Sequence, residues 1–320
     1  MRWVLILCLL AGCAATPGQI ERRRGDEIMV CGQLVHTGTP VVLWTDPGGY
    51  DAYRVERRFV PYDHSSWSAT TRETKDLQSP NRFSTRDADL TPTDLEQVRG
   101  GGWTLDLLRK VVDQIVIHYD ADGTSRVCFQ TLQDGRGLST HFMIDLDGTV
   151  YQTLDVKEKA WHATIVNGRS IGIELANRGA VTTPSLLREW YATDPEGRTR
   201  VTIPKKLGDG GERTKNFIGR PVRNGPIGGE IQGQWLVQYD YTPQQYAALI
   251  RLTAALCRVL PRIRCDYPRD IAGHLITHKL SDADLAKFHG ILGHYHVQTN
   301  KVDPGPAFQW DLLIDSVRRL

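Results

Sequence analysis

Histidine is the residue type whose positions in this sequence point most directly to chemistry. His118 ends the apolar segment QIVIH, and His294 and His296 come shortly before the turn-rich segment 301–310. A catalytic zinc ion takes three protein ligands from His, Asp, Glu or Cys and leaves one position for water. Each histidine taken alone is more typical of a hydrogen-bonded structural residue. Together, His118, one of the later histidines and Asp303 predict a zinc site, because the Pro-Gly-Pro turn after Asp303 limits the freedom of its carboxylate.

Several segments have the patterns of strands and helices that would position these residues. Apolar or alternating runs predict strand segments at 114–118, 140–154 and 170–175. The second of these contains Asp147-Gly148, a strong signal for a hairpin turn. Helical spacing predicts helices at 104–112, 243–260 and 311–319. Because strands and helices intermix along the chain, the patterns indicate an α/β or α+β sheet protein.

The overall composition limits the classes of protein to which the chain can belong. Of 320 residues, 40% are hydrophobic and 24% are charged, which suffices for a folded core and excludes general disorder. Lys and Arg number 39 against 37 for Asp and Glu, a net charge of +2. We therefore expect no nucleic-acid partner, because such binding usually needs a clearer basic excess.

The N-terminus has the features of a bacterial secreted lipoprotein. Arg2 precedes an apolar run that is too short to span a membrane and suits a secretory signal. The run ends in Leu-Ala-Gly-Cys13, which resembles a lipobox, where the chain is cut before the cysteine and the thiol is lipidated; an ordinary secretory peptide is the alternative. We expect a signal peptide at 1–12, a lipid on Cys13 and a tether at 13–27. With Ala14 rather than Asp after the cysteine, the expected location is the outer membrane, facing the periplasm.

Three further features of the chain carry predictions. Residues 28–102 are expected to form a small N-terminal β element, with strand-like runs up to Phe59, followed by an irregular connection from 61. Residues 178–235 are a long insertion, which is either a lid or wall of a substrate groove or a surface elaboration with no role in binding. Outside the cytoplasm, Cys257 and Cys265 are the expected disulfide pair, with four buried thiols in the chain as the alternative.

Five segments together resemble one known family. They are VIHYD (116–120), STHFMIDLDGTVYQ (139–152), AWHA (160–163), SIGIELAN (170–177) and GHYHVQTNKVDPGPAFQW (293–310). In kind and order they are similar to the zinc-dependent N-acetylmuramoyl-L-alanine amidases, a family shared by phage lysozymes, bacterial AmpD-like amidases and animal peptidoglycan recognition proteins. The resemblance implies an α/β fold with a central mixed β-sheet flanked by helices, and a zinc amidase domain over 103–320.

The resemblance also implies a role for individual residues. The zinc ligands would be His118, His294 and Asp303, with His296 as the alternative second ligand. Glu174 matches the general base, and Lys301 matches a lysine that stabilises the oxyanion. The residues that match the substrate-binding positions are His141, Trp161, His162 and Asn177.

The implied function is hydrolysis of the amide between N-acetylmuramic acid and L-alanine in peptidoglycan or muropeptides. Two alternatives stay open at this point. One is a recognition module that binds peptidoglycan without cutting it, and the other is a zinc amidase that acts on a different amide.

Overall fold

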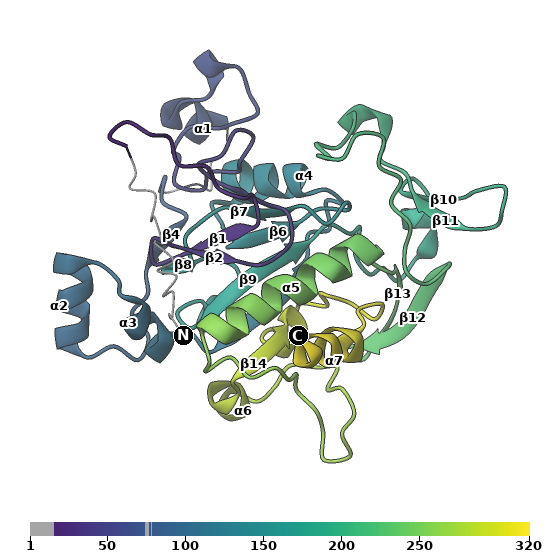
Figure 1. The fold of residues 1–320 in the computed structure, drawn as a ribbon. Helices are drawn as coiled ribbons and strands as arrows, with labels where there is room; N and C mark the ends of the chain where they lie inside the picture. The colour runs from purple at the N-terminus through teal and green to yellow at the C-terminus, as the bar shows by residue number, and fades with distance from the viewer. Residues whose placement is uncertain (1–15, 74–76, 78) are drawn as a thin grey trace, which may run out of the picture.

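A six-stranded sheet forms the centre of the computed structural model, which describes residues 16–73, 77 and 79–320 (Figure 1). Its strands lie in the order β14 (Gly290–Gly293), β5 (Gln114–Tyr119), β9 (Ser170–Leu175), β6 (Phe142–Ile144), β7 (Val150–Gln152) and β3 (Val41–Leu43). The first four strands are parallel, β7 is antiparallel to β6, and β3 is parallel to β7. The mixed central sheet and its three predicted strand segments are therefore confirmed.

The two central strands explain why the site forms where it does. Between their first residues and their carboxyl ends, β5 and β9 are apolar and buried, which is typical of parallel strands covered on both faces. The polar residues His118 and Glu174 stand at the carboxyl ends, directly opposite each other in the ladder. Ligands of open α/β sheets bind at this end of the strands.

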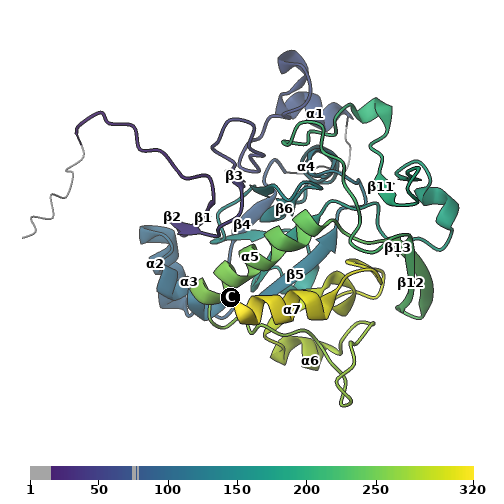
Figure 2. The same cartoon turned by 45° about the vertical axis from the view of Figure 1, so that its right-hand side comes forward.

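Helices cover both faces of the sheet. On one face lie α5 (Pro243–Val259) and α7 (Trp310–Arg319), which pack against each other (Figures 1 and 2). Thr242 starts α5 with a capping box, in which the side chains of Thr242 and Gln245 each bind the other's backbone N–H. On the other face, α4 (Ser125–Gln130) packs through Phe129 against Met143. The predicted helices at 243–260 and 311–319 are confirmed, as is the helix-flanked sheet.

The remaining elements are short. The helices are α1 (Trp67–Glu73), α2 (Pro92–Gly101), α3 (Leu105–Val111), which was predicted, and α6 (Asp282–Lys287). Two-stranded ladders join β1 (Glu27–Val30) to β2 (Gln33–His36), β4 (Phe83–Thr85) to β8 (Glu158–Ala160), β10 (Tyr191–Thr193) to β11 (Thr199–Val201), and β12 (Pro226–Ile231) to β13 (Gln234–Tyr239). One π-helical turn spans Thr131–Arg136, and 3₁₀ turns span Tyr62–His64, Thr164–Val166, Pro184–Leu187, Lys205–Leu207 and His294–His296.

The N-terminal segment corrects two expectations. The strand expected up to Phe59 is absent from the described residues 53–59, which bend around the buried Arg57; its guanidinium binds Glu73 and the carbonyl of His64. The connection expected to be irregular from 61 contains α1, β4 and α2, and α2 begins at Thr91 with a capping box. Because β3 belongs to the central sheet and β4 pairs with β8, this segment is built into the main fold.

Two other expectations concern cysteines. The predicted disulfide between Cys257 and Cys265 is wrong, since all four cysteines of the described part are free thiols. The signal peptide at 1–12 and Cys13 lie outside the described residues. Within the described residues, no helix is both long and apolar enough to cross a membrane.

The insertion is tied to the central sheet through two buried carboxyl groups. Asp145 precedes the hairpin turn, and Glu212 from the insertion lies within hydrogen-bond reach of it. Asp145 Oδ2 and both carboxyl oxygens of Glu212 have no hydrogen-bond donor in the part of the chain that the structure describes. Burial, followed by the negative charges of Asp145 and Asp147, raises the pKa of Glu212 to about 10. The pair is therefore stable only when a proton is shared between the two groups.

This shared proton predicts a fall in stability at high pH. The pKa of Glu212 is higher in the folded chain than in the unfolded chain. Its contribution to the free energy of unfolding is therefore complete below the pKa of the unfolded chain and disappears as pH rises toward about 10. Replacing Glu212 with Gln supplies a permanent donor to Asp145. We expect E212Q to melt at a higher temperature than the native protein at about pH 9 and to depend less on pH. Thermal unfolding across pH measures this, with the exposed Glu196→Gln as control. Parallel pH profiles for E212Q and the native protein would refute the shared proton.

Candidate active site

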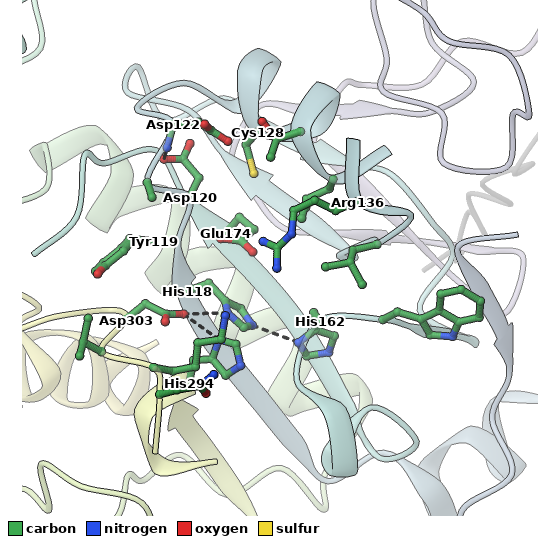
Figure 3. Close-up of a pocket in the computed structure, with 18 residues that line it drawn as sticks. His118, Tyr119, Asp120, Asp122, Cys128, Arg136, His162, Glu174, His294 and Asp303 are labelled. Atoms are coloured by element: carbon green, nitrogen blue, oxygen red, sulfur yellow. Dashed lines mark hydrogen bonds and ion pairs between the residues drawn. The ribbon is translucent and has the colours of Figure 1, made fainter. Parts of the chain in front are cut away.

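Three side chains converge at the carboxyl end of the sheet. His118 is near the end of β5, His294 follows the neighbouring strand β14, and Asp303 lies in the loop beyond it. Asp303 Oδ2 is 2.8 Å from Nδ1 of His118 and 3.0 Å from Nδ1 of His294 (Figure 3). The three residues are buried, and their ligand atoms all lie within 4.8 Å of one another. The structure thus brings together the three predicted metal ligands.

The outer nitrogens of the two histidines have their own partners. Nε2 of His294 is 2.7 Å from Oε1 of Gln298, which can only accept there, so this nitrogen carries the proton. Nε2 of His118 is 3.0 Å from Nδ1 of His162, whose Nε2 is 3.2 Å from Ser170 Oγ. With Nε2 of each ligand ring as the donor, both Nδ1 lone pairs face the Asp303 carboxylate.

This donor set fits a divalent metal ion. Two imidazole lone pairs and a carboxylate oxygen that face one another repel unless a cation lies between them. Burial, followed by the charge of His294, lowers the pKa of His118 to about 4, so its ring is neutral, as a ligand must be. Although burial opposes ionisation of Asp303, His294 and His118 hold its pKa below the usual range. Two imidazole nitrogens and one carboxylate oxygen, with room for water, are the donor set that is typical of catalytic zinc.

His296 is oriented away from this centre. Its Nδ1 accepts the N–H of Gly293 at 2.8 Å, and its Nε2 donates to the carbonyl of Ile276 at 2.6 Å. Both ring nitrogens are thus engaged with the backbone. Of the two candidates for the second ligand, the geometry selects His294.

The predicted general base and oxyanion lysine line the same cavity. Glu174 stands beside His118, and its Oε2 is buried without a hydrogen-bond partner among the described residues. Burial raises the pKa of Glu174 well above its usual range, and the charge of Asp303 acts in the same direction. Lys301, two residues before Asp303, lines the cavity. An unpaired carboxyl and an ammonium group beside the ligand cluster are suited to proton transfer and to stabilisation of negative charge.

The cavity has a volume of about 250 Å³ and extends beyond the ligand cluster. Trp161 and His162, both predicted to bind substrate, are on its wall. His162 is also the hydrogen-bond partner of His118, so it has a second role in orienting that ring. Sequence reasoning missed Asp120 and Arg136, and Figure 3 shows Arg136 reaching into the same space as Glu174. Arg136 comes from the π-helical turn after α4, for which the sequence carries no recognised signal.

Two predicted substrate-binding residues lie outside the cavity. His141 is fully buried: its Nδ1 accepts the N–H of Gly172, and its Nε2 is 3.0 Å from Arg86 and 2.9 Å from the carbonyl of Glu158. Asn177 donates from its side-chain amide to the carbonyl of Tyr239 in β13 at 3.0 Å. Their polar atoms are engaged within the fold, so both residues support the structure behind the site, and their contact with substrate stays a prediction.

The chain is similar to several solved structures of known proteins. Similar solved structures include AmpD as a selenomethionine derivative (18% identity, 75% of this chain and 92% of that chain, TM-score 0.34). They also include AmpDh3 from Pseudomonas aeruginosa in complex with anhydromuramic pentapeptide (18%, 64% and 59%, TM-score 0.36). A third is the amidase AmiD from E. coli with its anhydro-N-acetylmuramic acid peptide substrate (18%, 73% and 65%, TM-score 0.34). No curated protein sequence matches the chain.

The family model described as N-acetylmuramoyl-L-alanine amidase matches residues 108–306. The match begins in α3 and ends within the turn after Asp303, so it contains His118, Glu174, His294 and Lys301. Because it covers more than half of the 320 residues, the chain belongs to the N-acetylmuramoyl-L-alanine amidase family and is a peptidoglycan amidase.

Proposed function

We propose that this protein hydrolyses the amide between N-acetylmuramic acid and L-alanine with a zinc ion held by His118, His294 and Asp303. The observation that carries the proposal is the convergence of two Nδ1 lone pairs and one carboxylate within 4.8 Å, beside an unpaired buried glutamate. A binding module has no need of an unpaired carboxyl next to its metal ligands, since burying that group costs stability.

Each residue around the ligand cluster has a separate role in hydrolysis. When bound, the zinc ion supplies Lewis-acid chemistry. Glu174 accepts a proton from the attacking water and returns it to the amino group of the departing L-alanine. Lys301 donates a hydrogen bond to the oxygen of the substrate carbonyl as negative charge develops there. Trp161, on the cavity wall, offers an aromatic face to the sugar or the peptide.

Product analysis tests this function directly. The purified protein is incubated with muropeptides, with zinc and after chelation, and the products are analysed by mass spectrometry. The expected result is a free stem peptide that begins with L-alanine and forms only when zinc is present. Zinc-dependent cleavage of another amide would identify a different substrate. Binding of muropeptides by a zinc-loaded protein without cleavage would support the recognition module.

Lys301 provides a separate test of the mechanism. Lys301→Ala removes the ammonium group but none of the three converging ligands, so zinc content is expected to stay at the native level. Turnover is expected to fall about 10²–10³-fold, as for loss of one oxyanion donor. The exposed Lys206→Ala is the control. Native turnover in the K301A variant would exclude Lys301 from the reaction.

We also propose that the protein is lipidated at Cys13 and held at the outer membrane, facing the periplasm. The Leu-Ala-Gly-Cys sequence at the end of the apolar run supports this. In cells fed a radiolabelled fatty acid, the native protein is expected to carry label and to sediment with outer membranes. Cys13→Ser is expected to lose both properties, whereas Cys31→Ser keeps them. Label on the C13S variant would refute lipidation at this residue.

A further inference from the structure

The hairpin β12–β13, which begins in the insertion and ends just beyond it, reaches the loop that carries most of the active-site groups. This loop, residues 294–303, holds His294, Gln298, Lys301 and Asp303. The two-residue turn of the hairpin is Gln232-Gly233, and both residues have positive φ, 54° and 71°. A turn of this kind favours Asn or Gly at its first position, so glutamine there carries a backbone cost.

Hydrogen bonds from the side chain of Gln232 offset this backbone cost. Its Nε2 donates to the carbonyls of Tyr295 at 2.8 Å and Gln298 at 2.9 Å, and it lies 3.4 Å from the carbonyl of Lys301. Its Oε1 accepts the N–H of Lys279 at 3.3 Å. One carboxamide therefore contacts three carbonyls of the 294–303 loop. Gln298, in turn, orients the ligand His294 through Nε2.

A second glutamine of the same hairpin holds the turn after Asp303. Gln238 is fully buried; its Nε2 donates to the carbonyl of Pro304 at 3.0 Å, and its Oε1 accepts the N–H of Ala307 at 3.0 Å. The contact is close, because a Cβ on Gly305 would lie 2.2 Å from Oε1 of Gln238. Gln238 Nε2 is also 3.2 Å from Oδ1 of Asn177, just beyond the strand that carries Glu174.

We propose that the β12–β13 hairpin positions the 294–303 loop through hydrogen bonds from Gln232 and Gln238. In this role the hairpin fixes His294, Lys301 and Asp303 relative to His118 and Glu174 on the sheet. Gln232 and Gln238 are positioning residues, since they act on the backbone of the loop from behind the cavity. The inference rests on the proposed metal centre for its effect on zinc, but its effect on the loop itself does not depend on catalysis.

The sharpest variant is Gln232→Glu, which keeps the shape of the side chain and replaces the NH₂ donor by an acceptor facing three carbonyls. The matched control is Gln234→Glu, which makes the same change at an exposed position two residues away. A third variant, Gln232→Gly, removes the side chain and relieves the positive φ, so the hairpin itself is not weakened. Zinc affinity is measured by chelator competition, and backbone mobility by hydrogen exchange of residues 294–303.

For Q232E and Q232G we expect zinc affinity about 10-fold or more weaker, as for loss of groups that orient a ligand. We also expect faster exchange in residues 294–303 and a lower kcat with little change in KM, with native values for Q234E. Faster exchange confined to residues 294–303, with native exchange in the central sheet, separates positioning from a general loss of stability. Native zinc affinity and native exchange in both Gln232 variants would overturn the proposal. If the native protein proved not to cut muropeptides, the exchange data would still decide whether the hairpin holds the loop.

Discussion

Replacing His118 with Ala is expected to abolish zinc binding and hydrolysis together. The ring supplies one of three converging ligand atoms, and the two that remain, from His294 and Asp303, cannot hold the tetrahedral geometry. Metal catalysis supplies several kcal/mol of transition-state stabilisation, so activity should fall by at least about 10³-fold. Zinc content by elemental analysis and turnover of a muropeptide measure the two effects on the same sample.

A second consequence concerns stability and does not need a substrate. Zinc that binds only the folded chain raises its melting temperature, and chelation removes that increment. The H118A variant should melt at the same temperature with and without chelator, whereas the native protein should not. His274→Ala is the control, because this histidine is exposed and lies outside the ligand cluster. Full zinc content in H118A would show that His118 is not a zinc ligand.

The sequence was most informative where local pattern and fold agree. The apolar runs of β5 and β9 and the proline-started helix α5 follow from burial and capping rules that operate over a few residues. The two strands lie in register, so that His118 faces Glu174. The ligand set and Glu174 were proposed together from the resemblance to the amidase family. The parallel pairing of the two strands gives the physical reason that they meet, because residues at the carboxyl ends of neighbouring parallel strands lie at the same edge of the sheet.

The positions of individual side chains could not be predicted where long-range contacts decide them. His141 begins a strand segment at the edge of the site, but the buried Arg86 from the N-terminal segment reaches its ring. Arg86 lies 55 residues before His141 in the chain, and no local pattern pairs them. Asn177 is likewise bound by Tyr239 and Gln238 of β13. Contacts between segments far apart in the sequence therefore decide which side chains are left free to line the cavity.

Strand-favouring residues led to a wrong prediction in the N-terminal segment. The run that ends at Phe59 contains Tyr, Val and Phe, which favour strands. Its arginines, however, form side-chain bonds: Arg57 binds Glu73 and the backbone of His64. These bonds hold the chain in bends, whereas Val41 and Val42, without such partners, join the sheet beside β7. A strand forms where its backbone can pair with a neighbour, which composition alone does not show.

Replacing Glu174 with Gln is expected to keep zinc and remove most turnover. Gln has the same shape but cannot accept the proton of the attacking water, and general acid–base catalysis typically contributes about 10²–10⁴-fold. We therefore expect kcat to fall within that range, with native zinc content, since Glu174 is outside the group of three converging ligands. The exposed Glu230→Gln is a control for the same change of residue type. Native kcat in E174Q would exclude Glu174 as the base.

The same substitution separates a catalytic role from a structural one. Oε2 of Glu174 has no hydrogen-bond partner in the described part of the chain, and burial disfavours its charged form. A carboxyl group in that environment costs the fold stability, so an uncharged amide is expected to leave the melting temperature unchanged or to raise it. If Glu174 had only a structural role, E174Q would melt at a lower temperature than the native protein. Lost turnover together with undiminished stability would identify Glu174 as a group that lowers the stability of the fold and is needed for the reaction.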